Sequence, residues 1–287
     1  MADQAATLRS MMGATSKYSK VITFSSGKGG VGKSNIICNL AIMLAGRGLR
    51  VAILDMDLGL ANLDILLGVS STYNLTHVMA KQKKITEIIV PGPNNIMFIP
   101  GASGVSRLAN MNENERNFLI KNFSELESLT DIILVDTGAG LSDNVLHFAL
   151  ASHALIVVTT PEPTARMDAY ALIKTAHNKD KSLPFHIIVN EVASDNEGEN
   201  VYNSLLDVCQ KHLSLELNFL GFVPTDPKIP QAVKRRRPFS IEFPNCNGSK
   251  SLEKITSKFQ NEFLPNHGKG KDRMQNSFFS RLFSIFK

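Results

Sequence analysis

The sequence predicts a doubly wound α/β fold, in which helices cover both faces of a mostly parallel sheet in a single domain. Short apolar runs rich in β-branched residues alternate along the chain with longer stretches in which apolar residues have helical spacing. Most of the short runs are continuously apolar, as expected for strands that are buried on both faces. These two observations together favour repeated strand–helix–strand units.

The expected elements follow one another in a regular order. The expected strands cover residues 21–25, 50–55, 96–100, 131–136, 154–159, 185–190 and 219–223. The expected helices cover residues 32–47, 112–129, 143–150, 165–177, 199–212 and 250–263. In the first helix, apolar side chains such as Ile36, Leu40 and Leu44 recur at helical spacing. No change of composition marks a linker between residues 19 and 264, so we expect one domain there, flanked by an arm (1–18) and a tail (265–287).

Composition and cysteine content exclude several classes of protein. Hydrophobic residues make up 43% and charged residues 20% of the 287 residues, which excludes a disordered or fibrous chain. No apolar run approaches the roughly 18 residues of a spanning helix, and the first residues lack the apolar core of a signal peptide. Cys38, Cys209 and Cys246 form no CxxC pair, so we expect no disulfide framework, zinc site or iron–sulfur site, and a cytoplasmic location.

Positive charge is concentrated in two places. The net charge is +5, and the tail carries Lys269, Lys271, Arg273, Arg281 and Lys287 against Asp272. The second place is the run KRRR at residues 234–237. Such a run is a solvated helix end, a nucleic-acid patch or a surface that meets acidic lipid. The sequence favours the solvated helix end and leaves the other two open.

A phosphate-binding loop follows the first expected strand and begins the first helix. It consists of Gly27, Lys28, Gly29, Gly30, Val31, Gly32, Lys33 and Ser34, which match the pattern GxxxxGK[ST]. Glycines let the backbone N–H groups turn inward around phosphate oxygens, and the helix N-terminus favours the same anion. Lys33 can then reach the β- and γ-phosphates, and the Ser34 hydroxyl can ligate Mg²⁺. The strand–loop–helix context disfavours the alternative, a glycine-rich surface turn.

A second lysine, Lys28, lies inside this loop, where it has no packing role. The form KGGxGK[ST] resembles the deviant Walker A motif of the MinD/ParA family of ATPases. The resemblance implies that the chain hydrolyses ATP with Mg²⁺, and that Lys28 contacts phosphate across an ATP-sandwiched homodimer. The sequence DMDLGLANLD at residues 55–64 is similar to the MinD form of switch I, whereas ParA partition proteins usually read DxDPQG there.

The resemblance also assigns roles outside the loop. Asp57 matches the switch I aspartate that positions the attacking water, and Asp136 the Walker B aspartate, so Ser34, Asp57 and Asp136 are the expected metal-site residues. Their positions agree, because carboxylates at the ends of neighbouring parallel strands converge on one crevice. A strand-end cap is the alternative for either aspartate alone. Asn190 matches the adenine-reading asparagine, although an ordinary turn residue is also compatible there. Pro224 and Asp226 match the loop that closes over the base.

Within the family, the chain resembles the FlhG flagellar-number regulators, also called FleN or YlxH. Its arm reads DQAATLR, with Asp3, Gln4, Ala5, Leu8 and Arg9 in the positions of a motif that activates the GTPase FlhF. The segments PEPT (161–164), DAYALIK (168–174) and DTGAG (136–140) are similar to that group as well, while Arg166 and Met167 depart from it. The implied partners are an FlhF-type GTPase and a flagellar C-ring component or transcription regulator. Without the resemblance, a frayed arm would be the expectation.

The end of the tail predicts a short amphipathic helix. Its apolar face comprises Phe278, Phe279, Leu282, Phe283, Ile285 and Phe286. Such a basic segment lies in a lipid interface, and the MinD and FlhG proteins end in a membrane-targeting helix. The chain is therefore expected at the inner face of the cell membrane in its ATP state. The alternative is a helix docked on the domain's own core, which the Gly- and Lys-rich tether disfavours. The second functional hypothesis is a ParA-like, DNA-associated partition or transcription protein, although nucleic acid is the less favoured partner.

Overall fold

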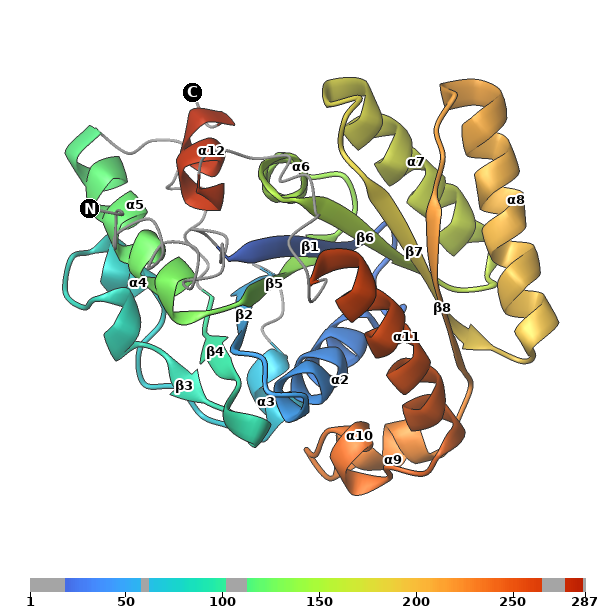
Figure 1. Cartoon of the computed structure of the whole chain (residues 1–287), viewed down its shortest axis with the longest axis horizontal. Helices are drawn as coiled ribbons and strands as arrows, with labels where there is room; N and C mark the ends of the chain where they lie inside the picture. The colour runs from blue at the N-terminus through green and yellow to red at the C-terminus, as the bar shows by residue number, and fades with distance from the viewer. Residues whose placement is uncertain (1–18, 58–61, 102–112, 265–276, 286–287) are drawn as a thin grey trace, which may run out of the picture.

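The computed structural model describes residues 19–57, 62–101, 113–264 and 277–285. Its centre is an eight-stranded sheet in the order β3-β4-β2-β5-β1-β6-β7-β8 (Figure 1). The strands are β1 (Lys20–Ser26), β2 (Val51–Met56), β3 (Val90–Pro91), β4 (Met97–Ile99), β5 (Ile132–Ala139), β6 (Ala154–Thr159), β7 (Phe185–Val192) and β8 (Asn218–Pro224). All neighbouring strands are parallel except β3 and β4. The predicted fold class is confirmed.

Helices cover both faces of this sheet. They are α2 (Lys33–Gly46), α3 (Leu63–Leu67), α4 (Leu75–Met79), α5 (Glu113–Leu129), α6 (Asp143–Ala151), α7 (Pro163–Lys179), α8 (Asp195–Leu213), α9 (Lys228–Lys234), α10 (Phe239–Glu242), α11 (Asn247–Phe263) and α12 (Phe278–Ile285), with 3₁₀ turns η1 (Ile85–Glu87) and η2 (Pro93–Asn95). One core lies between the sheet and α2, α3 and α11, and two lie on the other face, beneath α4, α5, α6 and α12 and beneath α6, α7 and α8. Successive strand residues point to opposite cores, as Ile53 and Leu54 do.

The position of α12 contradicts one expectation from the sequence. The tether was expected to keep this helix away from the domain, but α12 packs against α5 and α6 (Figure 1). Phe278, Phe279, Leu282 and Phe283 are at most 3% exposed and Ile285 is half-buried, so most of the described apolar face is buried in the protein. The reason is that the domain offers this face an apolar groove of its own, and burying each such side chain is worth about 1.5–3 kcal/mol. A tether does not prevent docking when the docking surface is this apolar.

The other differences are at element ends and in short elements. β5 continues three residues beyond its expected end, and the short elements β3, α3, α4, α9 and α10 were not predicted. Within the described residues, no helix is both long and apolar enough to cross a membrane. The arm (1–18), residues 58–61 of switch I, the tether (265–276) and Phe286 lie outside the described residues.

Candidate nucleotide site

The phosphate loop connects β1 to α2 at the carboxyl edge of the sheet. Gly30 and Gly32 have φ angles of 82° and 81°, in the left-handed region that glycine adopts without strain. A side chain on Gly27 would meet the backbone of Asp168 at 2.1 Å, so α7 packs directly against the loop. Gly29 and Gly30 are exposed and have open space before them. The loop is therefore held firmly at one end and leaves its middle open to an anion at the start of α2.

Lys33 and Asp136 form a buried ion pair at the base of the loop. The Lys33 ammonium donates to Asp136 Oδ1, and the Ser34 hydroxyl also hydrogen-bonds to this carboxylate. Burial raises the pKa of Asp136, which Lys33 counteracts. Each partner thus compensates for the desolvated charge of the other. A bound phosphate can take the place of the carboxylate on Lys33, because both are anionic acceptors.

Asp55 is a site residue that the sequence reasoning missed. It lies beside Asp136 in the paired strands β2 and β5, is 1% exposed, and accepts a hydrogen bond from the Asp57 N–H at 3.1 Å. Burial and the charge of Asp136 raise its pKa to about 7. The alternation of Asp55 and Asp57 around one apolar residue was the available signal, because two residues apart on a strand share a face. The Asp57 carboxylate lies next to Gly138, where a Cβ would be 3.5 Å from its Oδ1.

These carboxylates fit a divalent cation. Asp55 and Asp136 each hold one buried carboxylate oxygen without a hydrogen-bond partner, which is costly unless a ligand satisfies it. Mg²⁺ prefers oxygen ligands and usually binds through one or two carboxylates together with substrate phosphates. Asp136 and the Ser34 hydroxyl would hold the ion, with Asp55 close by, and the ion would neutralise charge on the phosphates. The pair of orphaned oxygens is the observation that supports a cation here.

Lys28, the second lysine of the phosphate loop, contacts the start of α7. Its ammonium donates to Glu162 Oε1 at 2.5 Å and to Thr164 Oγ1 at 3.1 Å, at the start of α7. The Lys28 and Glu162 side chains are 39% and 52% exposed, so solvent screens this pair. The hydrogen bond from Lys28 lowers the pKa of Glu162. Lys28 is thus held at the rim of the site by its own chain, in a contact weak enough to be exchanged.

The three residues expected around the base lie on neighbouring strand ends. The Asn190 amide, at the end of β7, donates to the Val31 carbonyl of the phosphate loop at 2.9 Å. Pro224 ends β8. Asp226 accepts hydrogen bonds from the N–H groups of Lys228 at 2.9 Å and Gly248 at 3.1 Å. Burial alone would raise the pKa of Asp226, but the hydrogen bonds from these N–H groups outweigh burial and hold the pKa below its usual value. Asp226 therefore fixes the starts of α9 and α11 beside the site.

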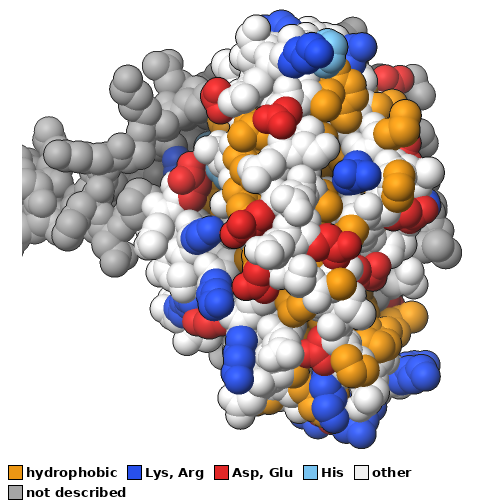
Figure 2. Space-filling model, turned by 90° about the vertical axis from the view of Figure 1, so that its right-hand side faces the viewer, with side chains coloured by type: hydrophobic (Ala, Val, Ile, Leu, Met, Phe, Trp, Pro, Cys, Tyr) orange, Lys and Arg blue, Asp and Glu red, His pale blue; other side chains and the backbone are white. Residues whose placement is uncertain are grey.

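The basic run at residues 234–237 ends α9. All four side chains are exposed, and Arg235 and Arg237 pair with Glu242 of α10, at 2.5 and 3.2 Å. Figure 2 shows Lys and Arg side chains gathered at the bottom of the molecule, at the height of α9 and α10 in Figure 1. The structure places this run at a solvated helix end, with two of its three arginines paired to the single carboxylate of Glu242. Pairing with Glu242 reduces the positive charge that this run offers to an anionic partner.

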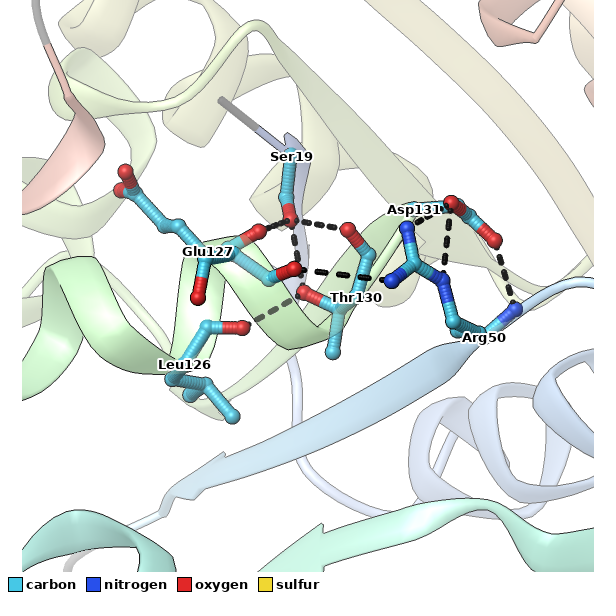
Figure 3. A network of polar contacts seen from close by, with 7 residues as sticks. Ser19, Arg50, Leu126, Glu127, Thr130 and Asp131 are labelled. Atoms are coloured by element: carbon cyan, nitrogen blue, oxygen red, sulfur yellow. Dashed lines mark hydrogen bonds and ion pairs between the residues drawn. The ribbon is translucent and has the colours of Figure 1, made fainter. Parts of the chain in front are cut away.

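A polar network joins the start of the described chain to the last turn of α5 (Figure 3). The Ser19 hydroxyl lies 2.6 Å from the Glu127 carbonyl and 2.6 Å from Thr130 Oγ1, and Arg50 pairs with Asp131 at 2.6 Å. The Glu127 side chain accepts from the Phe278 N–H at 3.0 Å and so caps α12. The root of the arm and the start of α12 therefore meet at the same turn of α5.

Comparison with known proteins gives the class. The ParA family model, described as "NUBPL iron-transfer P-loop NTPase", matches residues 17–260. The chain therefore belongs to the ParA family of P-loop NTPases, and as a member of that family it is an ATPase. The resemblance that the phosphate loop predicted is confirmed at this level.

Similar proteins within this family include two that are named for flagellar functions. The chain is 34% identical to "Antiactivator FleN" of Pseudomonas aeruginosa, over 88% of this chain and 90% of that protein. It is 38% identical to "Flagellum site-determining protein YlxH" of Helicobacter pylori, over 82% of this chain and 80% of that protein. Among solved structures, a chain of the MinC:MinD cell division protein complex of Aquifex aeolicus has a similar fold. The comparison gives a TM-score of 0.70 at 23% identity and covers 88% of this chain and all of that chain. The relatives named for flagellar proteins agree with the resemblance seen in the sequence.

Proposed function

We propose that this protein is a nucleotide-dependent switch that regulates the number or placement of flagella. Mg-ATP bound by the phosphate loop joins two copies, the dimer binds the inner face of the cell membrane through α12, and hydrolysis releases it. The observation that carries the proposal is the pairing of a complete phosphate loop with an amphipathic helix that buries Phe278, Phe279, Leu282 and Phe283 in the protein. A switch needs two states of one element, and this helix has two compatible environments, the groove and a lipid interface.

The site supports the catalytic half of this proposal. Lys33 and the start of α2 would hold the phosphates, Ser34 and Asp136 the metal, and Asp57 the attacking water. Use of nucleotide with Mg²⁺ is supported by the MinD structure of Pyrococcus horikoshii, described as complexed with Mg-ADP. In the dimer, Lys28 would leave Glu162 and contact the phosphates bound by the second copy. Because the Lys28 pair is exposed, exchanging it for a phosphate costs little.

The flagellar half rests on the relatives and on the arm. The relatives are called antiactivator FleN and flagellum site-determining protein YlxH, and the arm carries DQAATLR. We infer that the arm stimulates an FlhF-type GTPase and that the dimer meets a flagellar C-ring component or transcription regulator. The test is GTP turnover by such a GTPase, measured with the full chain and with residues 1–18 removed. Equal stimulation by both proteins would contradict the role of the arm.

Sedimentation with vesicles and with DNA tests the membrane half against the DNA-associated alternative. The wild type should sediment with anionic vesicles in Mg-ATP but not in ADP. Removal of residues 276–287 should abolish this binding while ATP-dependent dimerisation, measured by analytical ultracentrifugation, remains. Vesicle binding by the shortened protein would instead point to the basic run at residues 234–237. ATP-dependent sedimentation with DNA and not with vesicles would favour the ParA-like alternative.

A further inference from the structure

The end of β2 has two faces with different neighbours. Asp55 and Asp57 lie on the face of the nucleotide site, and Met56 between them points to the opposite face, because side chains alternate along a strand. Met56 is 5% exposed and belongs to the core that lies beneath α4, α5 and α12. One tripeptide therefore carries the carboxylates of the site and a side chain of the groove that holds α12.

Met56 reaches the underside of α12. It lines a small apolar cavity together with Leu75, Met79, Leu119, Phe123, Phe279, Leu282 and Phe283. The last three residues belong to α12, and the others are supplied by α4 and α5. A cavity at this place means that the side chains do not fill the space between groove and helix. Methionine is unbranched at Cβ, so Met56 can adjust to small changes in this packing more freely than a β-branched residue could.

The backbone that follows Met56 is tied to the carboxylate that precedes it. The Asp57 N–H donates to Asp55 Oδ1 at 3.1 Å, and Met56 is the residue between them. A backbone movement that brings Asp57 toward a bound nucleotide would turn this short segment and carry the Met56 side chain with it. Because α12 covers Met56, the turn changes the packing beneath Phe279 and Leu282.

We propose that Met56 couples the nucleotide site to α12, so that nucleotide-driven movement of Asp57 weakens the docking of the helix through this side chain. The inference deepens the proposed function and rests on it. Coupling between two sites is reciprocal, so docked α12 must also disfavour the nucleotide-bound arrangement of Asp57 by the same factor. Two independent measurements can therefore test it.

The first measurement is hydrogen exchange of the α12 amides, without nucleotide and with a slowly hydrolysed ATP analogue and Mg²⁺. In the wild type, protection should fall about a hundredfold in the analogue, within the 5–150-fold range usual for coupled sites. Met56→Ala should reduce this response to roughly a third or less of the wild-type ratio. Met79→Ala is the matched control, because it removes the same side chain from the same cavity but from α4. It should lower protection in both states and leave the ratio unchanged.

The second measurement is the affinity for the ATP analogue. Removing residues 276–287 should tighten binding by the same factor in the wild type, and by roughly a third of that factor or less in Met56→Ala. Met56→Leu should restore most of the response, which separates coupling from misfolding. If Met56→Ala keeps the wild-type ratio, as Met79→Ala is expected to do, the route through Met56 is wrong while the proposed function stands. If the wild-type helix itself does not respond to the analogue, the proposed function fails, and the coupling with it.

Discussion

Phe123 of α5 gives access to the docking of α12 without altering the helix itself. Its ring stacks on Phe279 with centroids 3.6 Å apart and planes 8° from parallel, and Phe123 is 4% exposed. We expect Phe123→Ala to weaken docking and to let the protein bind vesicles without ATP. The change leaves every residue of the amphipathic helix in place, so the affinity of the released helix for lipid is unaltered.

The size of the effect follows from the contacts. Truncating a buried phenylalanine costs about 3–5 kcal/mol in total. Much of this loss falls on contacts within the domain that persist when α12 leaves, so it does not affect docking. A stacked aromatic pair is worth about 0.5–1.5 kcal/mol beyond its buried area, and about 1.4 kcal/mol corresponds to a tenfold change. We therefore expect the docking equilibrium to shift about tenfold toward the released helix.

Vesicle sedimentation in ADP, together with hydrogen exchange of α12, measures both consequences. Phe185→Ala is the control, because Phe185 is equally buried but lies in the core beneath α7 and α8. It should lower the melting temperature without raising vesicle binding. The reasoning is refuted if α12 loses protection in Phe123→Ala and vesicle binding in ADP stays at the wild-type level, since the released helix would then not be the lipid-binding element.

Three further predictions concern single side chains. Burial raises the pKa of Glu127 to about 7 while α12 is docked, with Arg281 opposing; an exposed glutamate titrates near 4.3. The docked state thus binds more protons between these two values, so α12 protection factors should decline as the pH rises from about 4.3 to about 7 and then level off, and Glu127→Gln should abolish this decline. Asp57→Ala should bind ATP and accumulate dimer without turnover, which a phosphate-release assay with ultracentrifugation checks; normal turnover would refute its role. Lys28→Ala should weaken ATP-dependent dimerisation more than nucleotide binding, and Lys33→Ala the reverse, measured by ultracentrifugation and nucleotide titration; unchanged dimerisation of the Lys28 variant contradicts the sandwich.

Sequence patterns were sufficient for every strand of the sheet except β3, and for the phosphate loop. Both depend on local patterns: continuous apolar runs predict buried parallel strands, and glycines at fixed spacing predict a loop between β1 and α2. Asp55 was missed because its spacing from Asp57 indicates only that the two share a face, whereas its place beside Asp136 depends on the pairing of β2 with β5. The contact between Lys28 and Glu162 was missed for the same reason, since 134 residues separate them along the chain.

The error over α12 has a different cause. An amphipathic pattern states that one face of a helix must be buried, but it does not state against what. The groove that receives α12 is assembled from β2, α4, α5 and α6, none of which is adjacent to it in the sequence. Residues such as Glu127, which caps the helix, become recognisable only when α5 and α12 are placed together. Docking of α12 therefore depends on tertiary contacts that the amphipathic pattern alone does not show.

The docked helix changes what the nucleotide must accomplish. If α12 were free, ATP would only need to bring two helices together, and avidity of order 10² would account for membrane binding. Because α12 is docked, each copy first loses the contacts of Phe279 with Phe123, the cap from Glu127, and two hydrogen bonds from Arg281 to the Ala151 carbonyl. The lipid interface returns only part of that apolar burial. Moving such an equilibrium from 1:99 to 99:1 requires about 5.5 kcal/mol of differential binding. Avidity of order 10² supplies about half of this, so the remainder must come from nucleotide-driven weakening of the groove itself, and an ATP dimer with an unaltered groove should bind membrane poorly.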